Sequence, residues 1–140
     1  ATTGRPRRCG WFDLPLMRLS AKVNGFTSMV VTKLDVLDEL ERIQVCTHYE
    51  LDGQNLNFPP IRLEDYQRCK PVYTTLSGWQ TNTVGLTSWG DLPLKAQQYL
   101  QFLSDSAELS VGLVSTGAER NHTIEVNESW LEASEGLGYD

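Results

Sequence analysis

The stretch GFTSMVVTKL, residues 25–34, predicts a buried β-strand. β-branched and other apolar side chains follow one another without polar alternation, which is typical of a strand covered on both faces in an α/β sheet. Charge then ends the run at Lys33 and Asp35. A strand of this kind needs helices to cover it, so the segments on either side decide the fold class.

A helix is expected directly before this strand. Asp13 is a suitable N-cap, Pro15 falls in the first turn, and Gly25 is a suitable end. The apolar stripe that we expect to face the core is Leu16, Leu19 and Val23.

The middle of the chain predicts strands and a turn. Residues 43–51 and 71–76 are expected as strands, and Asp52-Gly53 predicts a hairpin that returns through residues 54–58. Pro59-Pro60 breaks the chain, and a short polar helix is expected from 63 to 69.

The last third predicts a helix and one more strand. Asp91 is expected to cap this helix and Pro93 to lie in its first turn. Its apolar positions are Ala96, Leu100, Leu103 and Ala107. Residues 111–114 form the expected strand, so helices alternate with strands and the predicted class is α/β with one β-hairpin.

Composition limits the partners. The 140 residues carry a net charge of −6, which disfavours nucleic acid because phosphate binding needs a basic face. No apolar run is long enough to span a membrane. We expect a domain at residues 1–126 and an acidic, solvated tail at residues 127–140, where no periodicity is visible.

Basic charge is concentrated at the start, in TTGRPRR (residues 2–8). Glycine allows close backbone approach to a ligand, and arginine offers a planar fork for carboxylate or phosphate. Pro6 stiffens the loop and lowers the entropy cost of presenting Arg5 and Arg7. A solvated basic terminus and a nucleic-acid arm are the alternatives.

A second loop, Thr32-Lys33-Leu34-Asp35, follows the strand quoted above. A carboxylate there can accept hydrogen bonds from the ring N1–H and the exocyclic amine of guanine, a donor pair that adenine lacks. The lysine stem can lie across a base while its ammonium group stays in water. The alternative is an exposed loop with an ordinary salt bridge.

A third loop, Ser115-Thr116-Gly117-Ala118, follows the last predicted strand. Its backbone N–H groups can be aimed at a base carbonyl, or the loop is a plain turn.

Taken in order, five stretches resemble the C-terminal part of adenylosuccinate synthetase, from residue 1 to about residue 124. They are residues 2–11, residues 32–38, Gly78-Trp79 with Thr83-Val84-Gly85, Leu92-Pro93 with Tyr99, and Ser115-Thr116-Gly117 with Arg120. The first two are long and specific.

The resemblance implies a cytoplasmic, homodimeric ligase of purine biosynthesis with a mixed-sheet core similar to that of P-loop GTPases. It implies that GTP, with Mg²⁺, phosphorylates the base oxygen of inosine monophosphate (IMP), and that the amine of aspartate then displaces the phosphate. The implied contacts with aspartate and IMP are Thr2, Thr3, Gly4 and Arg5. The implied GTP contacts are Arg7, Lys33, Leu34, Asp35, Ser115, Thr116 and Gly117.

The sequence departs from the family in four ways. It contains no GxxxxGK[ST] or related glycine-rich phosphate loop, and neither His48 nor His122 matches the catalytic histidine of the family. Ala118 stands where the family usually has proline, and the acidic extension has no counterpart. We therefore expect a C-terminal segment that lacks catalytic residues, lacks a metal site, leaves Mg²⁺ to the absent N-terminal part, and is inactive alone. The alternative is a non-catalytic remnant or a nucleotide-binding module.

Overall fold

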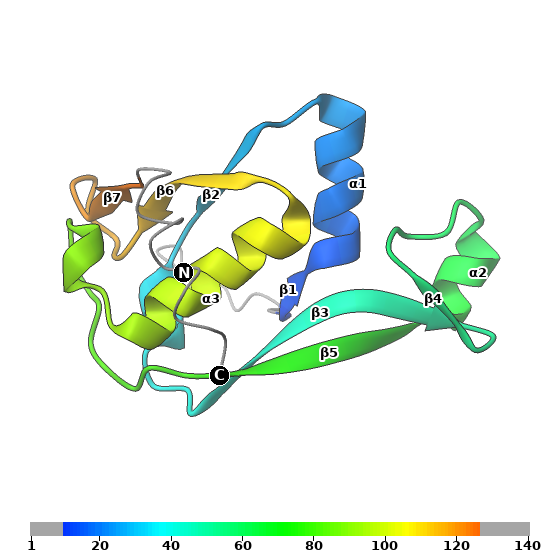
Figure 1. Cartoon of the computed structure of the whole chain (residues 1–140), viewed down its shortest axis with the longest axis horizontal. Helices are drawn as coiled ribbons and strands as arrows, with labels where there is room; N and C mark the ends of the chain where they lie inside the picture. Colours follow the sequence, from blue (N-terminus) through cyan, green and yellow to red (C-terminus); the bar gives the residue numbers. More distant parts are fainter. Residues whose placement is uncertain (1–9, 127–140) are drawn as a thin grey trace.

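The computed structural model describes residues 10–126 of the chain as a mixed α/β fold (Figure 1). The elements in chain order are β1 (Phe12–Asp13), α1 (Leu14–Asn24), β2 (Ser28–Val31), the 3₁₀ turn η1 (Leu34–Leu37), β3 (Arg42–Leu51), β4 (Gln54–Leu56), α2 (Leu63–Arg68), β5 (Lys70–Ser77), the 3₁₀ turn η2 (Trp89–Asp91), α3 (Leu94–Ala107), β6 (Ser110–Ser115) and β7 (Thr123–Glu125). The predicted α/β class is confirmed.

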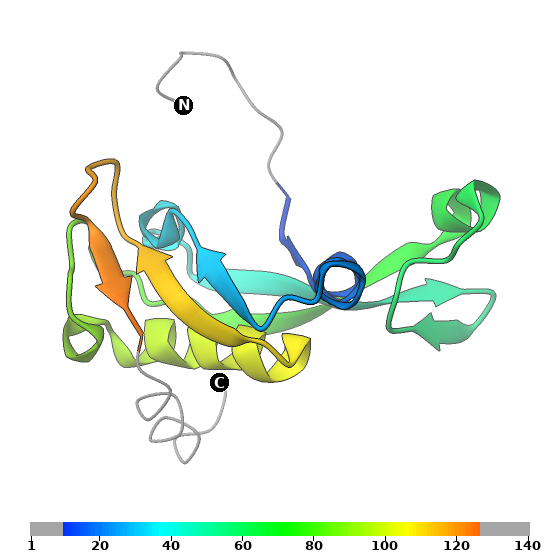
Figure 2. The ribbon, with the colours of Figure 1, turned by 90° about the horizontal axis from the view of Figure 1, so that it is seen from above.

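The strands form two mixed sheets. In the first, β3 pairs in parallel with β1 and in antiparallel with β4 and β5. In the second, β6 pairs in parallel with β2 and in antiparallel with β7. Figure 2 shows β7, β6 and β2 side by side, with α3 lying along them. This second sheet places the ends of β2 and β6 at the same edge.

Helix α1 begins and ends where its sequence predicts. The Asp13 carboxylate accepts a hydrogen bond from the Leu16 N–H (3.2 Å), and Gly25 ends the helix in the left-handed conformation (φ 68°). The predicted stripe is wrong, because Leu16 and Val23 are exposed and Leu19 is only half-buried. Leu14 and Pro15 are fully buried, and Met17 and Ala21 are partly buried against the core, so the inward face lies on a different side of the helix from the predicted stripe.

Strand β2 is shorter than predicted and is not covered on both faces. It runs over four residues, from Ser28 to Val31. Met29 is buried, but Val30 is 59% exposed. Within residues 10–126, β2 pairs only with β6, so it is an edge strand of this sheet. An apolar run alone does not distinguish an edge strand from a central one.

The hairpin and the last helix agree closely with the sequence. Asp52 and Gly53 both have positive φ (52° and 82°), as a tight turn between β3 and β4 requires. The predicted stripe of α3 is confirmed, because Ala96, Leu100, Leu103 and Ala107 are all buried.

The predicted N-cap of α3 is wrong. Asp91 lies in η2, and Pro93 occupies the N-cap position without a side-chain hydrogen bond. The Gln97 side chain instead donates to the backbone carbonyls of Trp89 (3.0 Å) and Leu92 (3.3 Å). These bonds fasten η2 to the first turn of the helix.

Candidate functional site

The loops after β2 and β6 meet at one edge of the second sheet. Val31 is paired with Val114 in parallel register, so the chain leaves both strands at the same level. The backbone N–H of Lys33 donates to Ser115 Oγ (3.4 Å) across the two loops. The structure therefore brings together Lys33 and Ser115, which are 82 residues apart in the sequence.

The backbone at Lys33 has an unusual conformation. Lys33 has a φ of 57° and a ψ of 45°, in the left-handed region that residues with a side chain rarely adopt. Such residues persist where the surrounding contacts hold them in place, often at binding sites. Here the conformation turns the chain sharply from β2 into η1, with Leu34 buried beneath the turn and Asp35 in its first residues.

Asp35 has one carboxylate oxygen without a partner. Its Oδ1 is buried and accepts no hydrogen bond from any of residues 10–126. A buried carboxylate oxygen normally accepts at least one hydrogen bond, because leaving it unpaired costs free energy. Asp35 also lines a hollow of about 710 Å³ between residues 35–39 and residues 80–84. Asp35 thus combines an unsatisfied acceptor with a place in the wall of this hollow.

The loop after β6 is held in a fixed shape. The N–H of Thr116 donates to the His122 carbonyl (2.8 Å), and Ser115 Oγ contacts the Gly117 carbonyl (3.5 Å). A Cβ at Gly117 would overlap the imidazole of His122, so only glycine fits beneath this ring. His122 Nδ1 is buried and has no hydrogen-bond partner in the described part of the chain.

A buried carboxylate behind the site was missed by the sequence reasoning. Asp38 Oδ1 accepts from Trp79 Nε1 (2.7 Å) and Thr83 Oγ1 (2.6 Å), and Oδ2 accepts from the Thr83 N–H (2.7 Å). The only signal in the sequence is that these residues lie in stretches that carry the family resemblance. Their contact spans 45 positions and has no local signature.

The same end of the molecule contains a glycine that is required sterically. The Gly78 N–H donates to the Glu41 carbonyl (2.8 Å), and a Cβ at Gly78 would overlap the Leu40 carbonyl oxygen. This close approach fixes where the chain leaves β5 and enters the segment that reaches Asp38.

The predicted aspartate and IMP contacts lie outside the described residues. They are Thr2, Thr3, Gly4 and Arg5, together with Arg7 on the GTP side, all within residues 1–9. Within residues 10–126, no group of three or more His, Cys, Asp or Glu side chains could hold a metal ion. No helix in this range is both long and apolar enough to cross a membrane.

Comparison with known sequences matches nearly the whole chain to one family. A sequence model of the adenylosuccinate synthetase family matches residues 1–124. The adenylosuccinate synthetase of a Synechococcus species is 53% identical over 127 residues, which cover 91% of this chain and 29% of that protein. That of Hydrogenovibrio crunogenus is 52% identical over 124 residues, covering 89% and 28%.

A solved structure gives the same result in three dimensions. Fully ligated adenylosuccinate synthetase from Plasmodium falciparum superposes with a TM-score of 0.83 at 30% identity, over 90% of this chain and 31% of that one. The described residues therefore share the mixed α/β fold of that structure. The chain is a member of the adenylosuccinate synthetase family, and it spans less than a third of the length of these relatives.

Proposed function

We propose that this chain supplies the guanine-recognition loops and the aspartate loop of a GTP-dependent ligase that joins aspartate to IMP. The observation that carries the proposal is the buried, unpartnered Oδ1 of Asp35 beside the paired loops of Lys33 and Ser115. In this proposal, residues 1–126 form the part that resembles the enzyme. The complete enzyme is a cytoplasmic homodimer, and it binds Mg²⁺ through other parts of its chain.

Guanine fits the unpartnered oxygen better than adenine does. The guanine edge presents N1–H and an exocyclic amine, and a carboxylate accepts from both. The equivalent edge of adenine offers no such pair, so adenine would leave the Asp35 oxygen buried and unsatisfied. The Lys33 stem covers the base in this arrangement, and loop 115–117 closes on its carbonyl edge.

The proposed binding of aspartate depends on the N-terminal loop. Arg5 clamps the aspartate carboxylate through a bidentate, charge-assisted contact, which orients the amine for attack on the activated base. Arg7 reaches toward GTP. Arg5→Ala in the complete enzyme is expected to weaken aspartate binding by about 1.5–3 kcal/mol, roughly 10- to 100-fold. Unchanged affinity would remove this assignment.

The preference for guanine is tested by replacing one oxygen of the Asp35 carboxylate with an amide nitrogen. Asp35→Asn replaces a carboxylate oxygen by an amide donor, which matches the C2 carbonyl of xanthine and opposes the C2 amine of guanine. Calorimetry with GDP, ADP and xanthosine diphosphate is expected to show a 10- to 100-fold loss for GDP (about 1.5–3 kcal/mol) and a gain for the xanthine nucleotide. Asp52→Asn, an exposed carboxylate in the β3–β4 turn, is the matched control.

Two outcomes would contradict the proposal. A wild-type chain that binds GDP and ADP equally has no guanine site of this kind. An Asp35→Asn variant with an unchanged nucleotide preference shows that the unpartnered oxygen is not the acceptor. A chromatographic assay for adenylosuccinate formed from GTP, IMP and aspartate distinguishes the two functions, because a ligase forms this product and a nucleotide-binding module does not.

A further inference from the structure

Residues 79–86, named here the bridging turn, lie between the two predicted guanine loops and contribute no predicted contact to GTP. On one side the bridging turn binds the segment that carries Asp35. Both Thr83 donors, the N–H and Oγ1, bind the Asp38 carboxylate at 2.7 and 2.6 Å. The Asp38 N–H in turn donates to the Asp35 carbonyl (3.1 Å). Thr83 therefore fixes the position of η1 and of the carboxylate in its first turn.

On its other side the bridging turn binds the loop after β6. The Gly85 N–H donates to the Thr116 carbonyl (3.1 Å), and Thr116 Oγ1 donates to the Leu86 carbonyl (2.7 Å). Within the turn, the Leu86 N–H donates to the Thr83 carbonyl (3.2 Å). Continuous hydrogen bonds thus run from Asp35 through Asp38, Thr83 and Leu86 to Thr116.

The three side chains that connect the loops are buried. Thr83 and Thr116 are 0% exposed, and Asp38 is 9% exposed. Water cannot replace a lost partner at such positions, so the bonded arrangement is strongly preferred over any shifted one. The carboxylate oxygens of Asp38 already accept from Thr83 and Trp79, which leaves this group to position the site and Asp35 to meet the base.

We propose that Thr83 is a positioning residue that sets the spacing between loop 33–35 and loop 115–117, and thereby the selectivity for guanine. The proposal rests on the proposed function of these loops. A base held between two loops is read by hydrogen bonds to both, and a shift of a few tenths of an ångström weakens the directional bonds more than the stacking contacts. Loss of Thr83 Oγ1 is therefore expected to lower discrimination more than affinity.

The test compares three substitutions. Thr83→Val keeps the shape and removes the hydroxyl, whereas Thr83→Ser keeps the hydroxyl. Thr75→Val is the matched control, since Thr75 is an exposed threonine of β5 that lies outside both loops and outside the hollow lined by Asp35. The measured quantity is the ratio of dissociation constants for inosine diphosphate and GDP, which differ by the exocyclic amine.

The expected result is a ratio about tenfold lower in Thr83→Val, and a ratio close to wild type in Thr83→Ser and in Thr75→Val. A merely structural threonine would lower the melting temperature and leave the ratio unchanged, which would overturn the proposal. Thr116→Val cuts the same connection at its far end, at the Leu86 carbonyl, and is expected to lower the ratio as well if Thr83→Val does not fold.

Amide hydrogen exchange tests the connection without a ligand. Thr83→Val is expected to speed exchange at both Lys33 and Thr116, while the amides of Leu100 and Leu103 in α3 stay protected. Exchange that changes at only one loop would overturn the positioning role. If the wild-type chain binds no GDP but Thr83→Val still speeds exchange at both Lys33 and Thr116, the proposed function is wrong while the connection between the loops exists. Failure of the proposed function and failure of the positioning role are therefore distinguishable.

Discussion

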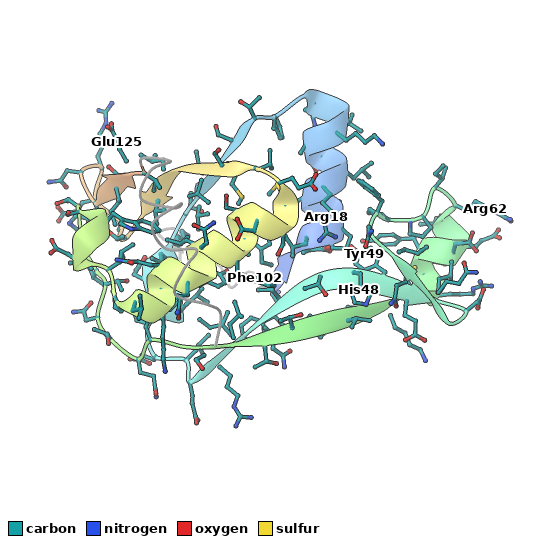
Figure 3. The ribbon with its side chains drawn as sticks, in the orientation of Figure 1. Arg18, His48, Tyr49, Arg62, Phe102 and Glu125 are labelled. Carbon is teal, nitrogen blue, oxygen red and sulfur yellow. The ribbon has the colours of Figure 1, made fainter. Side chains whose placement is uncertain are left out.

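The two ends of the molecule use charged side chains in opposite ways. Figure 3 labels Arg62, by α2, and Glu125, in β7, at opposite ends of the long axis. At the β7 end, Asp38 is buried and accepts three hydrogen bonds from neutral donors. At the α2 end, Asp52 pairs with Arg68 at 2.6 Å, with the two side chains 74% and 56% exposed.

This difference indicates where sequence changes have consequences. Helix α2 has no buried residue, and Ile61 just before it and Leu63 at its start are exposed. Exposed ion pairs contribute little because water and salt screen them and ordering the side chains is unfavourable. The buried carboxylate instead holds three donors that have no other partner, so the β7 end tolerates few substitutions and the α2 end tolerates many.

The largest effect is expected from Asp38→Ala, which attacks the buried end directly. It leaves the Trp79 indole N–H and both Thr83 donors buried without an acceptor. We expect a loss of about 4 kcal/mol in the free energy of unfolding, measured by urea titration. A loss below that of Asp52→Ala would show that the α2 end, and not the β7 end, is the more sensitive to substitution.

The next largest effect is expected at alkaline pH. Burial raises the pKa of Tyr99, in α3, to about 12. Because the pKa is higher in the folded state than its value of about 10 in the unfolded state, the fold is favoured fully below about pH 10. This contribution, about 3 kcal/mol, is lost as the pH rises through 12.

Denaturant titrations from pH 8 to 12 check this expectation. Tyr99→Phe is expected to flatten the decline in stability above pH 10. Part of the decline remains in that variant, since burial and a hydrogen bond to Asp13 (2.6 Å) also raise the pKa of Tyr49. A decline that is identical in wild type and Tyr99→Phe would contradict the assignment.

An intermediate effect is expected at the joint between the two ends, where α1 contributes Arg18 (Figure 3). Its guanidinium donates to the carbonyls of Ser106 (3.1 Å), Thr47 (2.7 Å) and Asn57 (3.2 Å), which lie on α3, β3 and the segment after β4. Arg18→Met keeps the apolar stem and removes the three bonds. We expect it to lower the free energy of unfolding by about 2 kcal/mol, whereas equal stability would show that these carbonyls are solvated instead.

The smallest effect is expected at the surface of α2. Arg68→Ala removes the bridges to Asp52 and Asp65. The expected change in the free energy of unfolding is below about 1 kcal/mol and is smaller at high salt. A thermal melt at low and high sodium chloride measures it, and a loss comparable with that of Asp38→Ala would mean that the two ends do not differ.

Local signals in the sequence predicted the elements that local contacts determine. Asp13 and Gly25 delimit α1 because a cap and a left-handed end involve only neighbouring residues. The stripe of α3 was predicted because one buried face suffices to define it. The same reasoning failed for α1, whose inward face carries Leu14, Met17 and Ala21, while Leu16 and Val23 face outward.

The candidate site was predictable only in part. Lys33, Asp35 and Ser115 stood out by resemblance, and the parallel pairing of β2 with β6 places Lys33 against Ser115. The position of Asp38 was not predictable, because its partners arrive from a turn 41 to 45 residues further along the chain. Neither helical nor strand periodicity carries information about such a contact.

The fit of His122 over Gly117 has a consequence for how this chain can change over generations. The imidazole occupies the volume that a side chain at residue 117 would need. A mutation of Gly117 to alanine is therefore harmful in a background that still carries His122, and becomes tolerable once a smaller residue has replaced the histidine. The two substitutions are accessible in one order only, so the history of one position restricts the future of the other.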